Sequence, residues 1–459
     1  MRCVGGWRLG TAAVFVVAAS ARAAGAVDLL ERDGLALTFE LEAGVGGLLT
    51  KDTNFGVGRI DLQSGEVSGD AQWGEGYLKP SLSLDYDSAG AGALYGGVSA
   101  VGSLTVGDGD AGGFTDGGDK KLSLEALYGG WRSGALLADS LGEDALDLSA
   151  GRQNFHVGDG FLIWDGNFDT RGDGGYWLGP RTVFDFAGLA RADTSPLGGQ
   201  LFFLRADHDQ GHTELAGVNL DYGLSGLGLG DDGMLGAMYF QITDVDARFE
   251  AELPRDGMQL ATIRLNDVRV PGFEDAGLYA QYAREFGDGD DIDFDAQAFY
   301  IEPFYDFSWL PWSPTLAYRF AYFSGDADPD DDEREDFDPL FYDYSRGWGT
   351  WTQGEIVGEY LLFNSNQVNH MVHLSATPAE PVTIGALYYH FDLAEKDYFG
   401  TPVEDKDFAD EVNLYVDWTV NDNLFVGALS GVAWPGQAAK ELFGDDPFYL
   451  LLAYAIVTF

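Results

Sequence analysis

Apolar and polar residues alternate along most of the chain with a period of two. In residues 78–86 the even positions carry leucine, proline and tyrosine, whereas the odd positions carry lysine, serine and aspartate. The same alternation returns in residues 291–300 and 411–418. Because successive side chains of a β-strand point to opposite faces, each segment predicts a strand with one apolar and one polar face.

Eighteen such segments can be counted, separated by turns rich in Gly, Asp and Pro. The predicted strands lie near residues 35–49, 76–86, 91–106, 121–132, 144–154, 181–193, 199–207, 213–224, 233–244, 258–268, 277–287, 291–306, 313–324, 367–378, 382–393, 410–420, 423–434 and 447–459. A nineteenth candidate, residues 351–363, would give an odd count, so we assign it to a loop.

The connections between these strands alternate in length. Residues 194–198, 378–381 and 421–422 give short turns, whereas the acidic segment 326–338 falls in a long connection. Beyond the N-terminal leader no apolar run approaches the ~20 residues that a membrane helix needs. The pattern therefore predicts an all-β protein, a transmembrane antiparallel up-and-down barrel of 18 strands with short periplasmic turns and long acidic extracellular loops.

The two ends of the chain fit secretion to an outer membrane. Arg2 and Arg8 precede a short apolar stretch, and small residues at positions 21–26 offer a cleavage site, so residues 1–26 are interpreted as a cleaved signal peptide. The only cysteine, Cys3, lies in this leader, which predicts no disulfide in the mature domain 27–459. The last strand ends in Phe459, which is similar to the terminal aromatic residue that the outer-membrane assembly machinery recognises.

The composition agrees with a barrel that separates lipid from water. Glycine is abundant at 64 residues, and aromatic residues make up 14%. The net charge is −49, with 75 acidic residues against 26 basic ones. Such a field repels nucleic acid and anionic lipid surfaces, so we expect no nucleic-acid partner.

Several stretches resemble the alginate export family of outer-membrane channels. They are Gly151-Arg152-Gln153 with Gly158-Asp159-Gly160-Phe161, Phe323-Ser324-Gly325-Asp326 leading to Phe337-Asp338-Pro339-Leu340-Phe341, and Trp348-Gly349-Thr350-Trp351 with Gly354-Glu355 and Gly358-Glu359-Tyr360. The resemblance implies an eighteen-stranded barrel whose path for a polyuronate is lined by arginines and partly closed by loops.

Carried over to this chain, the resemblance implies a set of residues along the pore. Arg181, Arg205, Arg264 and Arg319 fall in the phase that faces the lumen, and Arg152 and Arg171 lie at the strand end and inward loop of residues 154–180. Strict alternation would turn Arg152 towards lipid, so a bulge or strand end is needed there. Guanidinium groups can pass a sugar carboxylate from one bidentate contact to the next. The alternative is that each arginine neutralises a nearby carboxylate such as Asp185, Glu125 or Glu355.

The acidic charge bears on the solute. A polyuronate would be repelled unless the acidic residues lie away from its path, and a neutral sugar or a small cation is the alternative. The charge also fits a solvated loop surface adapted to salt. The sequence thus predicts a porin-like channel for passive passage of a hydrophilic solute or polysaccharide, monomeric and without cofactor.

Other activities were weighed against this hypothesis. His208 and His212 could form a metal site, but they fall in a predicted surface hairpin. His370 and His373 point to opposite faces of one strand, which argues against a shared site. Two acidic loops, Asp108 to Asp119 and Asp326 to Asp338, could bind Ca²⁺ although neither has EF-hand spacing. No catalytic motif is found, so no enzyme is predicted. A surface adhesin or receptor acting through the acidic loops is the alternative function.

Overall fold

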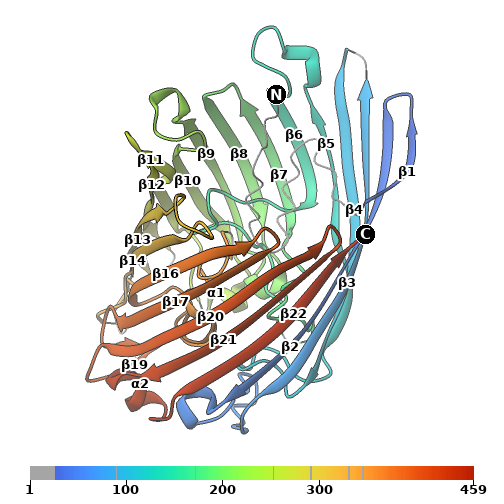
Figure 1. The fold of residues 1–459 in the computed structure, drawn as a ribbon. Helices are drawn as coiled ribbons and strands as arrows, with labels where there is room; N and C mark the ends of the chain where they lie inside the picture. The colour runs from blue at the N-terminus through green and yellow to red at the C-terminus, as the bar shows by residue number, and fades with distance from the viewer. Residues whose placement is uncertain are drawn as a thin grey trace.

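Eighteen antiparallel strands form a closed barrel in the computed structural model (Figure 1). The structure describes residues 26–88, 90–170, 172–251, 253–289, 292–328, 331–343 and 346–459, so the predicted signal peptide lies outside the described residues apart from Ala26. The barrel strands are β2 (Leu35–Lys51), β3 (Gln72–Ser88), β4 (Gly92–Gly107), β5 (Lys120–Arg132), β6 (Leu146–Gln153), β7 (Phe184–Asp193), β8 (Leu197–Arg205), β9 (Glu214–Gly223), β10 (Met234–Asp244), β11 (Gln259–Val270), β12 (Phe273–Asp288), β13 (Asp293–Asp306), β14 (Thr315–Phe323), β16 (Gln367–Ala379), β17 (Val382–Leu393), β20 (Asp407–Asn421), β21 (Leu424–Pro435) and β22 (Phe448–Thr458).

All eighteen predicted strands are confirmed, and residues 351–363 lie in a loop as expected. The largest differences in bounds are at β3, β7, β12 and β20, where the strand starts shift by three or four residues. The sequence pattern missed four short strands, β1 (Val27–Arg32), β15 (Glu333–Arg334), β18 (Asp397–Tyr398) and β19 (Thr401–Pro402), and two short helices, α1 (Ala247–Glu250) and α2 (Gln437–Leu442). None of the described helices is both long and apolar enough to span a bilayer.

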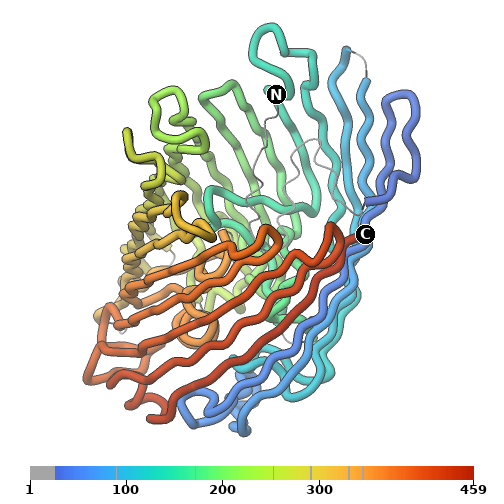
Figure 2. Tube along the Cα trace, viewed as in Figure 1, coloured from blue at the N-terminus to red at the C-terminus, as the bar shows by residue number. Residues whose placement is uncertain are grey.

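The barrel closes where the last strand meets the first, seen as the red and blue ends of the trace in Figure 2. β22 pairs with β2 from Glu42 opposite Thr458 to Lys51 opposite Tyr449. The backbones of Leu41 and Phe459 exchange two further hydrogen bonds of 2.8 and 2.9 Å. Beyond that point β1 takes over as the neighbour of β2, and it continues the line of β22. The seam is therefore held by backbone pairing along its whole length.

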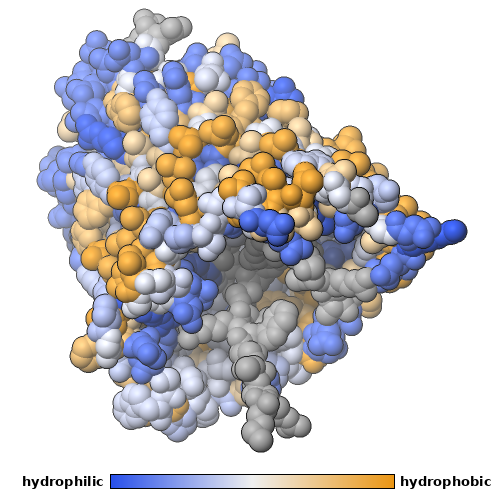
Figure 3. All heavy atoms as spheres, turned by 90° about the horizontal axis from the view of Figure 1, so that it is seen from above, coloured by the Kyte–Doolittle hydropathy of each residue, from blue (hydrophilic) through white to orange (hydrophobic). Residues whose placement is uncertain are grey.

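On β20 the outer face is apolar and the inner face is polar, as the alternation predicts. Leu414 is 56% exposed and Trp418 47% on the outside, whereas Glu411 is fully buried inside. Figure 3, which views the end that carries the short turns, shows hydrophobic side chains gathered on the flanks of the barrel. Exposed aromatic residues lie on the outer wall near both ends, such as Tyr239, Tyr388 and Trp434 near the long loops and Trp309, Trp312 and Trp418 near the turns. Two such girdles are typical of an outer-membrane barrel.

β13 is one of the strands that reverse the expected orientation. The apolar row of β13, which includes Phe294, Ala296 and Tyr300, is buried inside the barrel and not on the lipid side. Loops pack against this part of the inner wall, so the apolar residues have protein as their neighbours. Alternation alone therefore predicts the strand correctly but does not tell which face is inside.

Glycines face large aromatic rings across neighbouring strands. The ring of Tyr77 on β3 lies over Gly44 on β2, and that of Tyr454 on β22 lies over Gly427 on β21, so a Cβ at either glycine would overlap the ring. Aromatic residues that cover glycines in this way help to fix the register between strands. Part of the high glycine content is explained by this packing.

Candidate channel interior

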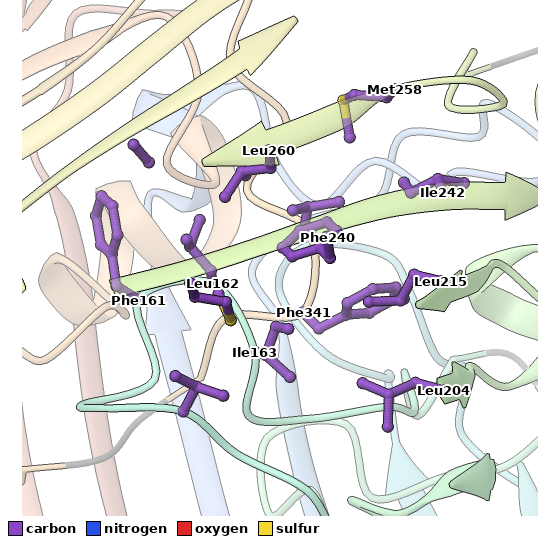
Figure 4. Close-up of a cluster of buried hydrophobic side chains, with 14 of the residues drawn as sticks. Phe161, Leu162, Ile163, Leu204, Leu215, Phe240, Ile242, Met258, Leu260 and Phe341 are labelled. Carbon is purple, nitrogen blue, oxygen red and sulfur yellow. The ribbon is translucent and has the colours of Figure 1, made fainter. Parts of the chain in front are cut away.

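Two long loops enter the barrel and fill much of its interior. The first connects β6 to β7 (residues 154–183), and its side chains Phe161, Leu162 and Ile163 are almost fully buried. They pack against Leu204, Phe240 and Leu260 on the inner faces of β8, β10 and β11 (Figure 4). The predicted inward loop around residues 156–180 is therefore confirmed.

The second loop connects β14 to β16 (residues 324–366) and covers the other side of the interior. It contains a π-helix, Gly354–Leu362, whose residues Ile356, Val357 and Leu361 are buried against β16 to β22. The carboxylate of Glu411 on β20 accepts the backbone N–H groups of Ile356 (3.1 Å) and Val357 (2.8 Å). A carboxylate of the wall thus satisfies two donors at the start of this helix.

The two loops are joined to each other inside the barrel. The indole Nε1 of Trp351 donates a hydrogen bond of 2.9 Å to the carbonyl oxygen of Asp159. The Trp351 ring also contacts Phe161 with centroids 4.7 Å apart, and the N–H of Trp164 donates to the carbonyl of Phe341 at 2.8 Å. Movement of one loop would therefore break contacts of the other.

Three of the predicted pore arginines lie inside the barrel, and each is ion-paired. Arg319 donates to Glu302 (2.7 Å) and to the carbonyl of Gly349 (2.6 Å), and its guanidinium lies 4.6 Å from the Trp351 ring centre. Arg264 donates to Asn219 (2.9 Å) and to Asp221.

The third, Arg181, is held at the base of the inward loop. It donates to Asp169 (2.7 Å) and to the hydroxyls of Ser103 and Ser123 at 2.9 and 3.1 Å. Nearby, Glu125 is buried; it accepts the N–H of Thr182 at 3.0 Å and lies 3.6 Å from the ammonium of Lys79. These pairs tie the loop to β3, β4 and β5.

Arg205 contradicts the predicted lumen phase. Its side chain is 44% exposed and shares the outer face of β8 with Leu201, whereas Phe202 and Leu204 point inwards. The prediction placed Arg205 inside because residues 201–204 are all apolar, so the alternation does not show which face of β8 is inside. Arg205 lies instead 3.9 Å from Glu214 at the loop end of the outer wall.

Arg152 and Asp185 form a pair where β6 meets β7. The register between these strands shifts after Gly151, so Phe184 and Ala187 are both buried and residues 185 and 186 form the bulge. Arg152 binds Asp185 and donates to the carbonyl of Glu125 at 2.8 Å. The bulge lies on β7, however, and β6 itself alternates without a break: Ser149 and Gln153 are buried inside, and Arg152 pairs with Leu127, which is 55% exposed on the outer wall. The predicted pore-lining position of Arg152 is therefore wrong, because the irregularity that would turn it inwards is on the partner strand. Arg171, the remaining predicted arginine, lies outside the described residues.

Two further arginines of the interior were missed. Arg346, in the second loop, donates to both oxygens of Glu302 (2.9 and 3.1 Å) and lies 3.9 Å from the Tyr279 ring centre. Arg191 on β7 lies between Asp147 of β6 and Gln200 of β8 and is half-buried. Counting in twos from the buried Ala187 would have found Arg191, whereas no local signal places Arg346 against Glu302.

Carboxyl groups surround the place where the two inward loops meet. Glu355 is buried, and the indole Nε1 of Trp177 donates to it at 3.4 Å. Burial, with the nearby Glu411 as a second cause, raises the pKa of Glu355 to about 8. Burial also raises the pKa of Glu359 and of Asp165 well above their ordinary range, and neighbouring carboxylates add to the effect. The junction is thus rich in carboxyl groups whose charge depends on pH.

The wall opposite Arg264 is acidic and aromatic. β2 lies nine strands from β11 around the eighteen-stranded barrel, which is half a turn. There Glu42 accepts the hydroxyl of Tyr77 at 2.8 Å, and on nearby β20 Asp417 accepts the indole N–H of Trp348 at 3.0 and 3.1 Å.

The histidines and acidic loops considered as metal sites are distributed over the structure. His370 hydrogen-bonds Tyr318 (2.7 Å) on the outer face, and His373 hydrogen-bonds Tyr415 (2.9 Å) on the inner one, so they point apart as predicted. Asp110 in the first acidic loop accepts three hydrogen bonds from Phe114 and Thr115. In the second, Asp338 is buried and bound by Arg255 at 2.6 and 2.8 Å. Calcium binding in either loop stays a prediction.

Comparison with solved structures identifies the same architecture in outer-membrane porins. OccK5 (OpdH) of Pseudomonas aeruginosa is 11% identical over 92% of this chain and 98% of its own, with a TM-score of 0.53. OccAB2 of Acinetobacter baumannii is 9% identical over 92% and 98%, with a TM-score of 0.56. OccK2 (OpdF) of P. aeruginosa, solved in complex with glucuronate, is 12% identical over 92% and 96%, with a TM-score of 0.53.

The family comparison adds function to this shared fold. No curated protein matches the chain. The family model described as alginate export matches residues 126–445, which is well over half of the chain. With a closed barrel, two inward loops and this match, the protein is an outer-membrane channel for hydrophilic solutes and belongs to the alginate export family.

Proposed function

We propose that this channel passes hydrophilic solutes of about sugar size by passive diffusion, and that it favours neutral solutes over polyanions. The observation that carries the proposal is the pairing of the inner arginines with the protein's own carboxylates. Arg181, Arg264 and Arg319 bind Asp169, Asp221 and Glu302, respectively. A guanidinium that already holds a carboxylate attracts a second one weakly, because the pair is nearly neutral at a distance.

The loops leave no surplus of positive charge in the interior. Arg346 shares Glu302 with Arg319 and also lies 3.3 Å from Asp159, so these two arginines are matched by two acidic groups. Burial raises the pKa of the Glu355, Glu359 and Asp165 carboxyl groups in the loops, so these groups gain negative charge only as the pH rises. A polyuronate, which carries one carboxylate per sugar unit, would therefore meet no net positive charge at the inner pairs, and like charges on the loops as the pH rises.

Passage of uronates is the second candidate, and two observations favour it. Arg191 has no hydrogen bond or ion pair among the described residues, and the Nε and Nη1 of Arg264 are unpartnered there. Family membership and the glucuronate bound in OccK2 point to the same solute class. Free guanidinium donors on the inner wall are the groups that would recognise a sugar carboxylate.

Solute flux into proteoliposomes separates the two candidates. We expect glucose to enter faster than glucuronate, and the current reversal potential under a potassium chloride gradient to indicate preference for the cation. Arg191→Gln should then leave glucuronate entry unchanged. A preference for glucuronate that Arg191→Gln removes and Arg205→Gln retains would support uronate passage instead, because Arg205 lies on the outer wall. Folded protein that never conducts would contradict both.

A further inference from the structure

A histidine and three aspartates gather on the outer wall, away from the channel interior. His390 and Asp392 are two residues apart on β17, so they share one face with the exposed Tyr388. In the adjacent strand β20, Asp410 lies opposite His390, and Asp407 lies opposite Asp392. The register shifts between these two pairs, which brings both aspartates of β20 to the same face as the histidine.

The two nitrogens of His390 face different carboxylates. Nε2 lies 3.4 Å from an oxygen of Asp392, and Nδ1 lies 3.1 Å from an oxygen of Asp410. One ligand atom each of His390, Asp392 and Asp407 lie within 4.8 Å of one another. Asp410 is itself fixed by the hydroxyl of Tyr388 at 2.7 Å. A metal-binding histidine commonly has its second ring nitrogen bound to a carboxylate in this way.

The pair of Asp392 and Asp407 lacks a cation in the described part of the chain. Like charges directly opposite each other on neighbouring strands are destabilising. No lysine or arginine among the described residues lies within 4 Å of either carboxylate. Lys406, the nearest in sequence, donates to the carbonyl of Ala394 and lies 3.2 Å from Glu395. A bound cation would supply the missing charge.

We propose that His390, Asp392 and Asp407 bind a divalent metal ion of the Zn²⁺ type, with Asp410 as the residue that orients the imidazole. Imidazole with carboxylates suits Zn²⁺, which accepts three protein ligands and leaves a further position for water. All three side chains are partly exposed, so the site is accessible from outside the barrel. The ion would link β17 to β20 beside the outer aromatic girdle.

Calorimetric titration of the folded full-length mature protein with Zn²⁺ in detergent tests the site. We expect one ion per chain, loss of that binding in His390→Ala and in Asp407→Asn, and a loss of affinity of about 10-fold to 100-fold in Asp410→Asn. The wild-type unfolding temperature should rise with Zn²⁺, and the His390→Ala temperature should not. Heat-modifiable migration on a gel checks that each variant is folded.

His208→Ala is the matched control, because Asp207, His208 and Asp209 form the other compact group of metal-ligating residues found among the described residues. Its Zn²⁺ binding should equal that of the wild type. The proposal is overturned if the folded wild type does not bind Zn²⁺, or if binding survives in His390→Ala and disappears in His208→Ala. Neither result would affect the proposed channel function, which is measured by solute flux.

Discussion

At the residue scale, the buried arginines of the loops act as structural ties. Arg255 and Asp338 have side chains only 3% and 1% exposed and are joined by two hydrogen bonds of 2.6 and 2.8 Å. The backbone N–H of Asp338 also donates to Glu285 on β12 at 3.0 Å. Arg255 thus joins the loop before β11 to the second inward loop.

Removing one partner of this ion pair should be costly. We expect Arg255→Ala to lower the free energy of unfolding by about 3 kcal/mol, because the buried carboxylate of Asp338 loses two hydrogen bonds to a cation and keeps only Arg334, 3.6 Å away, as a charged partner. Denaturant unfolding in detergent measures the change. The double variant Arg255→Met with Asp338→Leu should be much closer to the wild type, since both charges are removed together. Equal losses in the single and double variants would contradict this role.

The carboxyl group of Glu355 should make stability depend on pH. Its pKa is raised to about 8 in the folded protein, so folding keeps it protonated while the unfolded chain ionises it. Stability from this group is present at low pH and is lost progressively as the pH rises from the ordinary pKa towards about 8. The free energy of unfolding of Glu355→Gln should therefore rise relative to that of the wild type over this range, by up to about 5 kcal/mol, and no further above it. Thermal unfolding of both proteins against pH gives the comparison; parallel curves would contradict the assignment.

Single residues were harder to predict than strands. Arg264 and Arg319 were placed on the inner wall correctly because their strands alternate without interruption around them. Arg205 was placed on the wrong face, and Arg191 was missed, although both follow from the phase of the buried residues beside them. The partner of each arginine could not be predicted, because pairs such as Arg346 with Glu302 join segments far apart in the sequence.

At the element scale, strand positions followed from local pattern, whereas loop packing did not. The period of two holds whether a strand faces lipid or an inward loop, so all eighteen strands were predicted. The inverted face of β13 depends on contacts with residues 161, 337 and 351, which the local pattern does not contain. The inward position of the first loop was expected from family resemblance, and its contact with the second loop was not.

Trp351 links the second inward loop to the first. It is fully buried, contacts Tyr300 with ring centres 4.5 Å apart, and hydrogen-bonds the first loop at Asp159. Trp351→Ala should release the second loop from the first while leaving the barrel wall intact. We expect a higher and noisier single-channel conductance in planar bilayers, and Trp309→Ala, in an exposed turn at the other end, should conduct like the wild type. Unchanged conductance in folded Trp351→Ala would show that the loops do not narrow the path.

At the scale of the whole molecule, closure of the barrel stabilises the folded protein, whereas its net negative charge destabilises it. The paired seam between β2 and β22 removes the open edge that a sheet of this size would otherwise have. The 75 acidic residues repel one another, and only 26 basic residues offset this repulsion, so it destabilises the folded barrel. The inner ion pairs use several of these basic groups, so much of the negative charge is left uncompensated.

Salt should therefore stabilise this barrel as a whole. Raising the salt concentration from about 0.01 M to about 0.15 M shortens the screening length from roughly 30 Å to roughly 8 Å, which weakens repulsion between distant loops but not the buried pairs. The thermal unfolding midpoint should rise with potassium chloride and level off once the screening length is shorter than the spacing between loops. An uncharged solute at matched osmolarity is the control and should leave the midpoint nearly unchanged. A midpoint that falls with salt would mean that exposed ion pairs, and not repulsion, dominate the electrostatics of the folded barrel.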